Sequence, residues 1–210
     1  MVEYERLVPS LAFGAFLLFP SFATQSHAEE SIVTLGITSV YTDLKINEDC
    51  VTLSTDDLGG TLSCPGFGGY GATITEADLR LSVFYGDLGS WYLEGAWESF
   101  QTFNNIGTTL EWRLEDGVPF ATILRWTIEF SPGDEAQNGE ILVVSKVGQP
   151  GEGEACIVGY VDARGNENAN ELARDIADEL AIDFQCRVET PEYRGAQGFM
   201  TGIPVRSFGP

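Results

Sequence analysis

Histidine and cysteine, the side chains that most often act as bases, nucleophiles or metal ligands, are scarce in this chain of 210 residues. There is one histidine, His27, and there are four cysteines, Cys50, Cys64, Cys156 and Cys186. The chemistry open to these five residues depends on where the chain is processed and on whether the thiols are free.

Residues 1–28 have the organisation of a secretory signal peptide. A short apolar run at 11–19 (LAFGAFLLF) precedes a proline and a polar stretch, and Ser26-His27-Ala28 has small residues at the two positions that signal peptidase reads. An alternative cut follows Ala23. The apolar run is shorter than the roughly 20 residues of a membrane helix. We therefore expect an exported protein, periplasmic or secreted, whose mature chain has lost its histidine.

Without a histidine or a free thiol, most familiar catalytic sites cannot be built. A Ser-His-Asp triad, a Cys-His pair and a His-ligated zinc site are all excluded. Chemistry by carboxylates remains, because glycoside hydrolysis needs only two acids at a suitable separation. Acids are so numerous that no pair stands out, and Asp56-Asp57 and Asp134-Glu135 are typical of solvated turns. The catalytic residues stay unassigned, and we expect no cofactor and no metal site.

Two motif-like stretches are better explained by local structure than by a ligand. Residues 66–71 (GFGGYG) match G-x-G-x-x-G, but residues 72–75 (ATIT) favour a strand where a dinucleotide site requires a helix. Asn166, Asn168 and Asn170 are spaced like the start of a calcium loop, which then lacks its glycine at the sixth position and its glutamate at the twelfth. We expect a glycine-rich connection and a helix cap.

Residues 86–107 are rich in glycine and aromatic residues without a clear period, which predicts a loop with one helical turn near 96–100. The loop contains four aromatic residues that we predict to bind a partner: Trp91, Tyr92, Trp97 and Phe100. Aromatic residues on connecting segments are typical of surfaces that recognise sugars, peptides or proteins. The alternative is that these rings fold back onto the sheet as a lid, because exposed apolar patches are unusual on monomers.

Acidic residues dominate the charge of the chain, which is −21. Loss of residues 1–28 removes Arg6, Glu3 and Glu5, and leaves ten basic residues, 30 acids and a net charge of −20. Such a surface repels phosphate backbones and anionic headgroups, which disfavours nucleic acid and membrane surfaces as partners. An unknown protein or glycan partner remains open.

The elements that carry the cysteines favour one pairing. Residues 50–64 are typical of two short strands around a Gly/Asp turn. Folding this hairpin sets Thr52 opposite Leu62 and Cys50 opposite Cys64, within disulfide reach.

The second pair follows from the lengths of a strand and a helix. Residues 155–162 form a predicted strand, and residues 169–184 a predicted amphipathic helix with Asn168 as its cap and an acid three residues later as in a capping box. The two elements have similar lengths, so a helix that doubles back along the strand brings Cys186 beside Cys156. We predict the disulfides Cys50–Cys64 and Cys156–Cys186.

Apolar patterning predicts six further strands, at residues 32–41, 72–76, 79–85, 109–115, 118–130 and 140–147. Asp116-Gly117, between two of these runs, indicates a hairpin. A three-residue loop sets Leu114 against Phe120 and Leu110 against Leu124, which matches the apolar faces.

Four segments carry a resemblance to known sequences: residues 64–70 (CPGFGGY), 119–126 (PFATILRW), 155–163 (ACIVGYVDA) and 168–178 (NANELARDIAD). In these segments the chain resembles a group of uncharacterised exported proteins of Gram-negative bacteria, over roughly residues 41–186. The resemblance implies an exported bacterial protein. It implies no mechanism, because the group has no assigned activity.

The sequence thus predicts a signal peptide over 1–28, one α+β domain over 29–186 and an irregular tail over 187–210. The domain is expected to be a mostly antiparallel sheet or open barrel with one C-terminal amphipathic helix packed on it and two disulfides. We predict a periplasmic, acidic binding or interaction domain without catalysis and without a membrane span in the mature protein. The alternative is a carboxylate-dependent hydrolase that acts on glycans.

Overall fold

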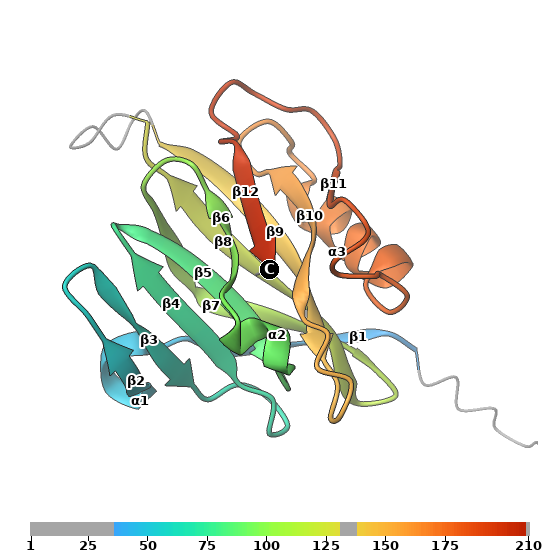
Figure 1. The fold of residues 1–210 in the computed structure, drawn as a ribbon. Coiled ribbons are helices and arrows are strands. Elements are labelled where there is room, and N and C mark those ends of the chain that lie inside the picture. Colours follow the sequence, from blue (N-terminus) through green and yellow to red (C-terminus); the bar gives the residue numbers. More distant parts are fainter. Residues whose placement is uncertain (1–35, 131–137, 209–210) are drawn as a thin grey trace, which may run out of the picture. The chain divides into compact units, whose positions relative to one another are not determined.

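A computed structural model describes residues 36–130 and 138–208 of the protein. The predicted signal peptide and the first residues of the predicted strand at 32–41 lie outside this part. The described residues are mostly β: they form a curled open sheet, or half-barrel, with few helices and two disulfides (Figure 1). The elements are β1 (Thr38–Asp43), α1 (Ile46–Asp49), β2 (Val51–Thr55), β3 (Gly59–Cys64), β4 (Ala72–Ala77), β5 (Arg80–Gly86), α2 (Ser90–Leu93), β6 (Ala96–Phe100), β7 (Asn104–Glu115), β8 (Val118–Ile128), β9 (Gly139–Gly148), β10 (Cys156–Asp162), α3 (Ala169–Leu180), β11 (Glu192–Tyr193) and β12 (Pro204–Phe208).

The large sheet has the strand order β1-β7-β8-β9-β5-β4-β3-β2 and forks at β9. Residues 141–146 of β9 pair with β10, whereas Val147 and Gly148 pair in parallel with the end of β5. The β2–β5 meander therefore turns away from the β7–β10 branch, and the sheet curls around the space between the two branches (Figure 1). β6 and β12 pair with each other outside this sheet.

The inner, concave side of the curl holds the main hydrophobic core. Thr52, Leu62, Ile74 and Val83 lie directly opposite one another across β2, β3, β4 and β5. The two branches meet through large buried side chains, which include Trp112, Trp126, Tyr85 and Tyr160, and Phe100 of β6 packs among them. These aromatic residues pack in the interior that the curl encloses, together with the aliphatic residues of the same cluster.

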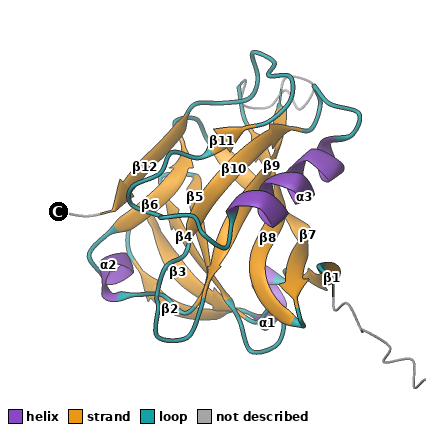
Figure 2. Ribbon diagram, turned by 90° about the vertical axis from the view of Figure 1, so that its right-hand side faces the viewer, coloured by secondary structure: helices purple, strands orange, loops and turns teal. Residues whose placement is uncertain are grey.

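The outer side of β8, β9 and β10 packs against α3, which lies across these strands (Figure 2). Ile123, Val144 and Val158 of the sheet are buried together with Ala173 and Ile176 of the helix. β8 to β10 are therefore covered on both faces, which explains why β9 and β10 are nearly continuous apolar runs rather than alternating ones.

Both predicted disulfides are confirmed. Cys50–Cys64 has a Cα–Cα distance of 4.2 Å, and Thr52 lies opposite Leu62 as the hairpin predicts. Cys156–Cys186 has a Cα–Cα distance of 5.5 Å and joins β10 to the segment that follows α3.

α3 begins at Ala169, as predicted, but its cap and its end differ from the prediction. The helix ends at Leu180, four residues before the predicted end, and Asn168 occupies the cap position without a capping hydrogen bond from its side chain. Asn166 instead uses its side chain to hold Asp162 and Ala196, since its Nδ2 donates to both of their carbonyl oxygens. The capping-box prediction is wrong because the Asn168 side chain caps no helix N–H, and Asn166 serves the loop and the C-terminal segment.

The β7–β8 turn is shorter than predicted. Asp116-Gly117 forms a two-residue turn with φ of 51° and 84°, the left-handed values that a type I′ hairpin requires. A bulge at Phe120, near the start of β8, shifts the register, so Leu110 still lies opposite Leu124, as predicted. Leu114 lies opposite Pro119 and not opposite the next residue, the predicted Phe120.

Two segments predicted to be irregular form a pair of strands. Residues 96–100, predicted as a helical turn, are strand β6, and β12 comes from the predicted tail. The two strands pair antiparallel across about half of the chain length. Neither strand is evident locally, because each finds its partner only when residues far apart in the sequence come together.

Candidate functional site

The four aromatic residues predicted to bind a partner do not form one exposed surface. Trp91 is 7% exposed and Phe100 is 0% exposed. The Trp91 ring packs edge-on against Phe84 and Phe208, and its Nε1 donates a hydrogen bond of 2.7 Å to the Gly153 carbonyl. Trp91 is therefore not exposed and covers the outer face of β5, and a binding role for it stays a prediction.

Phe100 is also a core residue, packed edge-on against Trp126 and Tyr160. Tyr92 and Trp97 are half-buried, and the Tyr92 hydroxyl lies 3.0 Å from Oγ1 of Thr75. Trp91 and Phe100 thus pack back onto the sheet, as the alternative prediction for these rings expects. A binding role for Tyr92 and Trp97 stays a prediction.

A pocket of about 640 Å³ opens at one end of the half-barrel, where β2, β4 and β8 end and β3, β5 and β7 begin. Its apolar lining extends the concave core to the surface through Ile46, Leu62, Ile74, Leu81 and Phe103. Pockets of this size at the mouths of barrels commonly hold small molecules. Two other pockets, of about 300 and 360 Å³, are smaller.

Strand register explains why this end of the interior is open. Leu62 lies opposite Ile74, and the next row outward is Thr55, Gly60, Glu76 and Leu81. Gly60 has no side chain to fill that row. The apolar floor of the pocket, formed by Leu62 and Ile74 in the row below, is therefore accessible to a ligand from outside. A side chain at Gly60 would clash with the backbone of β2, because an added Cβ would lie 2.6 Å from the Ser54 carbonyl oxygen.

The rim of the pocket is polar and acidic. Neutral polar side chains come from α1, β2 and the start of β7 and include Asn47, Thr52, Ser54, Thr55 and Asn105. Two carboxylates, Glu76 and Glu129, also line it, and no lysine or arginine does so within the described part of the chain. Neither carboxylate forms an ion pair with another described residue.

Asn104 holds one side of the pocket in place. Its Oδ1 accepts a hydrogen bond of 2.9 Å from the backbone N–H of Leu81, and its Nδ2 donates to the Thr102 carbonyl and to Ser99. This buried side chain fastens the turn before β7 to β5, so Phe103 and Leu81 face the same space.

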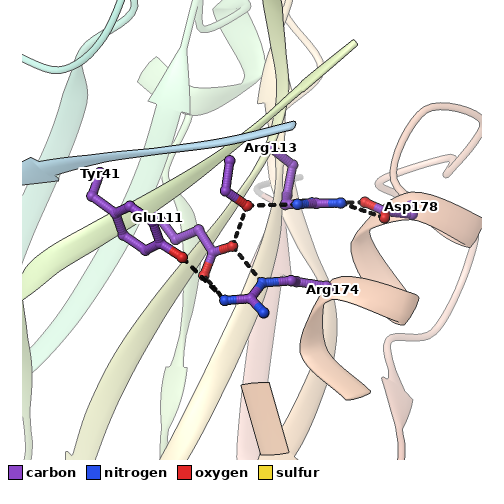
Figure 3. A network of polar contacts seen from close by, with 6 residues as sticks. Tyr41, Glu111, Arg113, Arg174 and Asp178 are labelled. Atoms are coloured by element: carbon purple, nitrogen blue, oxygen red, sulfur yellow. Dashed lines mark hydrogen bonds and ion pairs between the residues drawn. The ribbon is translucent and has the colours of Figure 1, made fainter. Parts of the chain in front are cut away.

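A second polar cluster fastens α3 to the sheet and is fully paired (Figure 3). Arg174 of α3 donates to both oxygens of Glu111 on β7, at 2.7 and 3.2 Å, and Arg113 forms a two-bond ion pair with Asp178. Burial alone would raise the pKa of Glu111, but hydrogen bonds from Arg174 and Ser39 outweigh it and lower that pKa. Because these charged groups hydrogen-bond to one another, the role of the cluster is to hold α3 against the sheet.

A third cluster centres on Glu98, whose side chain is 0% exposed. It accepts hydrogen bonds from the Ile157 backbone N–H at 2.6 Å and from Nε of Arg206 at 2.5 Å. Burial raises the pKa of Glu98 to about 7, although the charge of Arg206 and both hydrogen bonds act in the opposite direction. Glu98 lines none of the three pockets, so it joins β6, β10 and β12 rather than facing a ligand.

Sequence reasoning missed the pocket because its walls come from segments far apart, from α1 to the end of β8. The predicted pairing of Thr52 with Leu62 located one wall. Glu98 had a usable signal: it is the single acid of an apolar and aromatic strand, AWESF, and an acid in such a setting is expected to have a buried partner.

Over residues 36–130 and 138–208 no group of three or more His, Cys, Asp or Glu side chains could hold a metal ion. In the same part of the chain no helix is long and apolar enough to cross a membrane. The chain matches no protein-family model, no curated protein and no solved structure.

Proposed function

We propose that this protein is an exported, acidic, non-catalytic binding module that takes a small ligand into the pocket at the open end of its half-barrel. The observation that carries the proposal is a space of about 640 Å³ that joins an apolar floor to a polar rim. Ligand sites combine these features, because the apolar lining supplies affinity and a few polar groups fix orientation.

Export is supported by the cysteines and by the first residues of the chain. All four cysteines are paired in two disulfides, which persist in oxidising compartments. The predicted signal peptide at residues 1–28 and the resemblance to exported bacterial proteins agree with this placement.

The absence of catalysis is supported by the state of the reactive groups. No described cysteine is free. The carboxylates of Glu98 and Glu111 already accept hydrogen bonds. Glu98 accepts them from Arg206 and from the Ile157 backbone N–H, and Glu111 accepts one from Arg174. These groups hold the fold together, and their partners leave them poorly placed to transfer protons to a ligand.

The second candidate, a carboxylate-dependent hydrolase of glycans, is favoured by one observation: Glu76 and Glu129 line the same pocket. Against it, neither Trp91 nor Trp97 lines the pocket, and Phe103 is the one aromatic residue among its described lining residues. Incubation with cell-wall glycan fragments distinguishes the two candidates. A hydrolase releases reducing ends and loses this activity in Glu129→Gln, whereas a binding module releases none.

Binding is tested with a neutral, environment-sensitive fluorophore such as N-phenylnaphthylamine. We expect its emission to rise on adding the protein and to fall back in Thr55→Trp, because an exposed β2 side chain then covers the space above Gly60. Val51→Trp is the matched control, since Val51 is also an exposed β2 residue but does not line the pocket. Equal fluorescence from the two variants would contradict the proposed site.

A further inference from the structure

We infer that the ligand of this pocket is an organic cation with an apolar body, held with its charged group at the rim between Glu76 and Glu129. This inference rests on the proposed function and specifies the ligand class. Three features of the pocket support it: the depth of its apolar lining, the sign of its rim charges and the direction in which the neighbouring basic side chain points.

The apolar lining selects the body of the ligand. Leu62, Ile74 and Leu81 come from three adjacent strands and continue the concave core, so a ligand that enters meets hydrocarbon below the rim. The gain from removing apolar surface from water makes an aliphatic or aromatic body the best fit for this floor.

The rim selects the charge. Both of its ionisable side chains are carboxylates, and neither is neutralised by a described lysine or arginine. Glu129 is half-buried, so its charge is less screened by water than that of a fully exposed acid. A cationic group at this position is attracted by both carboxylates, and an anionic group is repelled by both.

The nearest base on the same strand does not change this balance. Arg80 precedes Leu81 in β5, and consecutive side chains of a strand point to opposite faces. Arg80 is also occupied by an ion pair with Asp78 at 2.9 Å. Lys45 directly precedes Ile46 and Asn47 but is not among the residues that line the pocket, so the lining of the described part of the chain holds two acids and no base.

An inorganic cation does not fit these residues. Calcium and magnesium require several oxygen ligands, and the described residues offer no group of three or more acidic, histidine or cysteine side chains. An alkylammonium group needs no such shell, because its positive charge is compact and its carbon chain can lie on the apolar floor.

The test compares three probes that share a decyl chain and differ in head charge: decyltrimethylammonium, the neutral decyl glucoside and the anionic decanoate. Isothermal titration calorimetry of the full mature protein, below the micelle concentration of each probe, measures their affinities. We expect the cation to bind at least about tenfold more tightly than the glucoside, a preference that weakens at high salt. We expect decanoate to bind most weakly.

The variant Glu76→Gln/Glu129→Gln should bind the glucoside as the wild type does and lose the preference for the cation. The matched control is Glu167→Gln/Glu171→Gln, which removes the same number of charges at exposed positions beside and within α3, outside the pocket. This control should keep the preference, because the effect is local rather than a consequence of net charge.

The outcomes distinguish a failure of the charge inference from a failure of the proposed function. If the cation and the glucoside bind equally, or if both double variants lose the preference to the same extent, the charge inference is wrong and the binding pocket stands. If no probe binds to the wild type, the proposed function fails together with the inference.

Discussion

Glu98 on β6 and Arg206 on β12 form an ion pair across 108 residues of sequence, with 2.5 Å between a carboxylate oxygen and Nε. Arg206 also donates to the carbonyl oxygens of Glu189 and Cys186, and its guanidinium lies 4.9 Å from the centre of the Phe208 ring. One arginine thus joins the last strand to the segment that carries the second disulfide.

Glu98 should make stability depend on pH near neutrality. Its pKa is about 7 in the folded protein against an ordinary 4.5, so the folded state binds the proton more tightly than the unfolded state. The contribution of Glu98 is therefore fully present below about pH 4.5 and is lost as the pH rises through about 7. Tyr160, which faces Glu98, has a pKa raised well above its ordinary value by burial and does not titrate in this window.

We expect the free energy of unfolding of the wild type, relative to Glu98→Gln, to fall by about 3 kcal/mol between about pH 4.5 and pH 8. Urea denaturation at several pH values measures this difference. The exposed Glu167→Gln is the control and should follow the wild type throughout. Parallel profiles for wild type and Glu98→Gln would show that Glu98 keeps an ordinary pKa.

Glu111 should make stability depend on pH in the acid range. Because its pKa is lowered, its contribution is present above its ordinary pKa and is lost as the pH falls through the lower, folded value. Glu111→Gln should cost about 1–3 kcal/mol at neutral pH, since a charge-assisted hydrogen bond to Arg174 is lost. The cost should disappear at acid pH.

Hydrogen exchange of the α3 amides checks the location of that effect. It should accelerate in Glu111→Gln and stay unchanged in Asp175→Asn, which alters an exposed acid of the same helix. Equal protection of α3 in both variants would mean that the Glu111–Arg174 pair does not fasten the helix.

The two disulfides should contribute unequally. Cys156–Cys186 closes a separation of 30 residues and both of its cysteines are buried, whereas Cys50–Cys64 closes 14 residues and Cys50 is only half-buried. Loop entropy gives about 3 kcal/mol for the shorter loop and somewhat more for the longer one. Guanidinium unfolding of Cys156→Ala/Cys186→Ala and Cys50→Ala/Cys64→Ala should show the larger loss for the first variant. The reverse order would contradict the loop argument.

Gly66 should be required for packing. An added Cβ would clash with the ring of Trp112, which is fully buried, and with the Tyr70 carbonyl. Gly66→Ala should destabilise the protein by about 1–3 kcal/mol. Gly107→Ala is the matched control, because its nearest neighbour would lie at an ordinary 3.4 Å. Thermal unfolding compares the two, and an unchanged midpoint for Gly66→Ala would refute the packing role.

The parts of the fold that could be predicted are those that neighbouring residues determine. The 50–64 hairpin, the strands β4, β5 and β7 to β10, and both disulfides follow from apolar period, turn residues and short loop lengths. Asp116-Gly117 also predicted a hairpin, yet the bulge that follows it could not be read from the sequence, because the apolar pattern fits the three-residue loop as well.

The parts that could not be predicted depend on contacts between distant residues. β6 was mistaken for a helical turn because its partner, β12, lies about a hundred residues further along the chain. The pocket required the end of β8 and the start of β7 to meet β2–β5, which no local pattern specifies. The burial of Trp91 could not be predicted, because a loop that packs onto the sheet and a loop that faces a partner have the same composition.

The most direct test of the central claim is an NMR titration of the ¹⁵N-labelled mature protein with N-phenylnaphthylamine. The account predicts shifts of the backbone amides of β2 to β5 around Thr52, Leu62, Ile74 and Leu81, with the amides of α3 unchanged. The absence of shifts, or shifts centred on α3 or on Tyr92 and Trp97, would contradict a ligand site at the open end of the half-barrel.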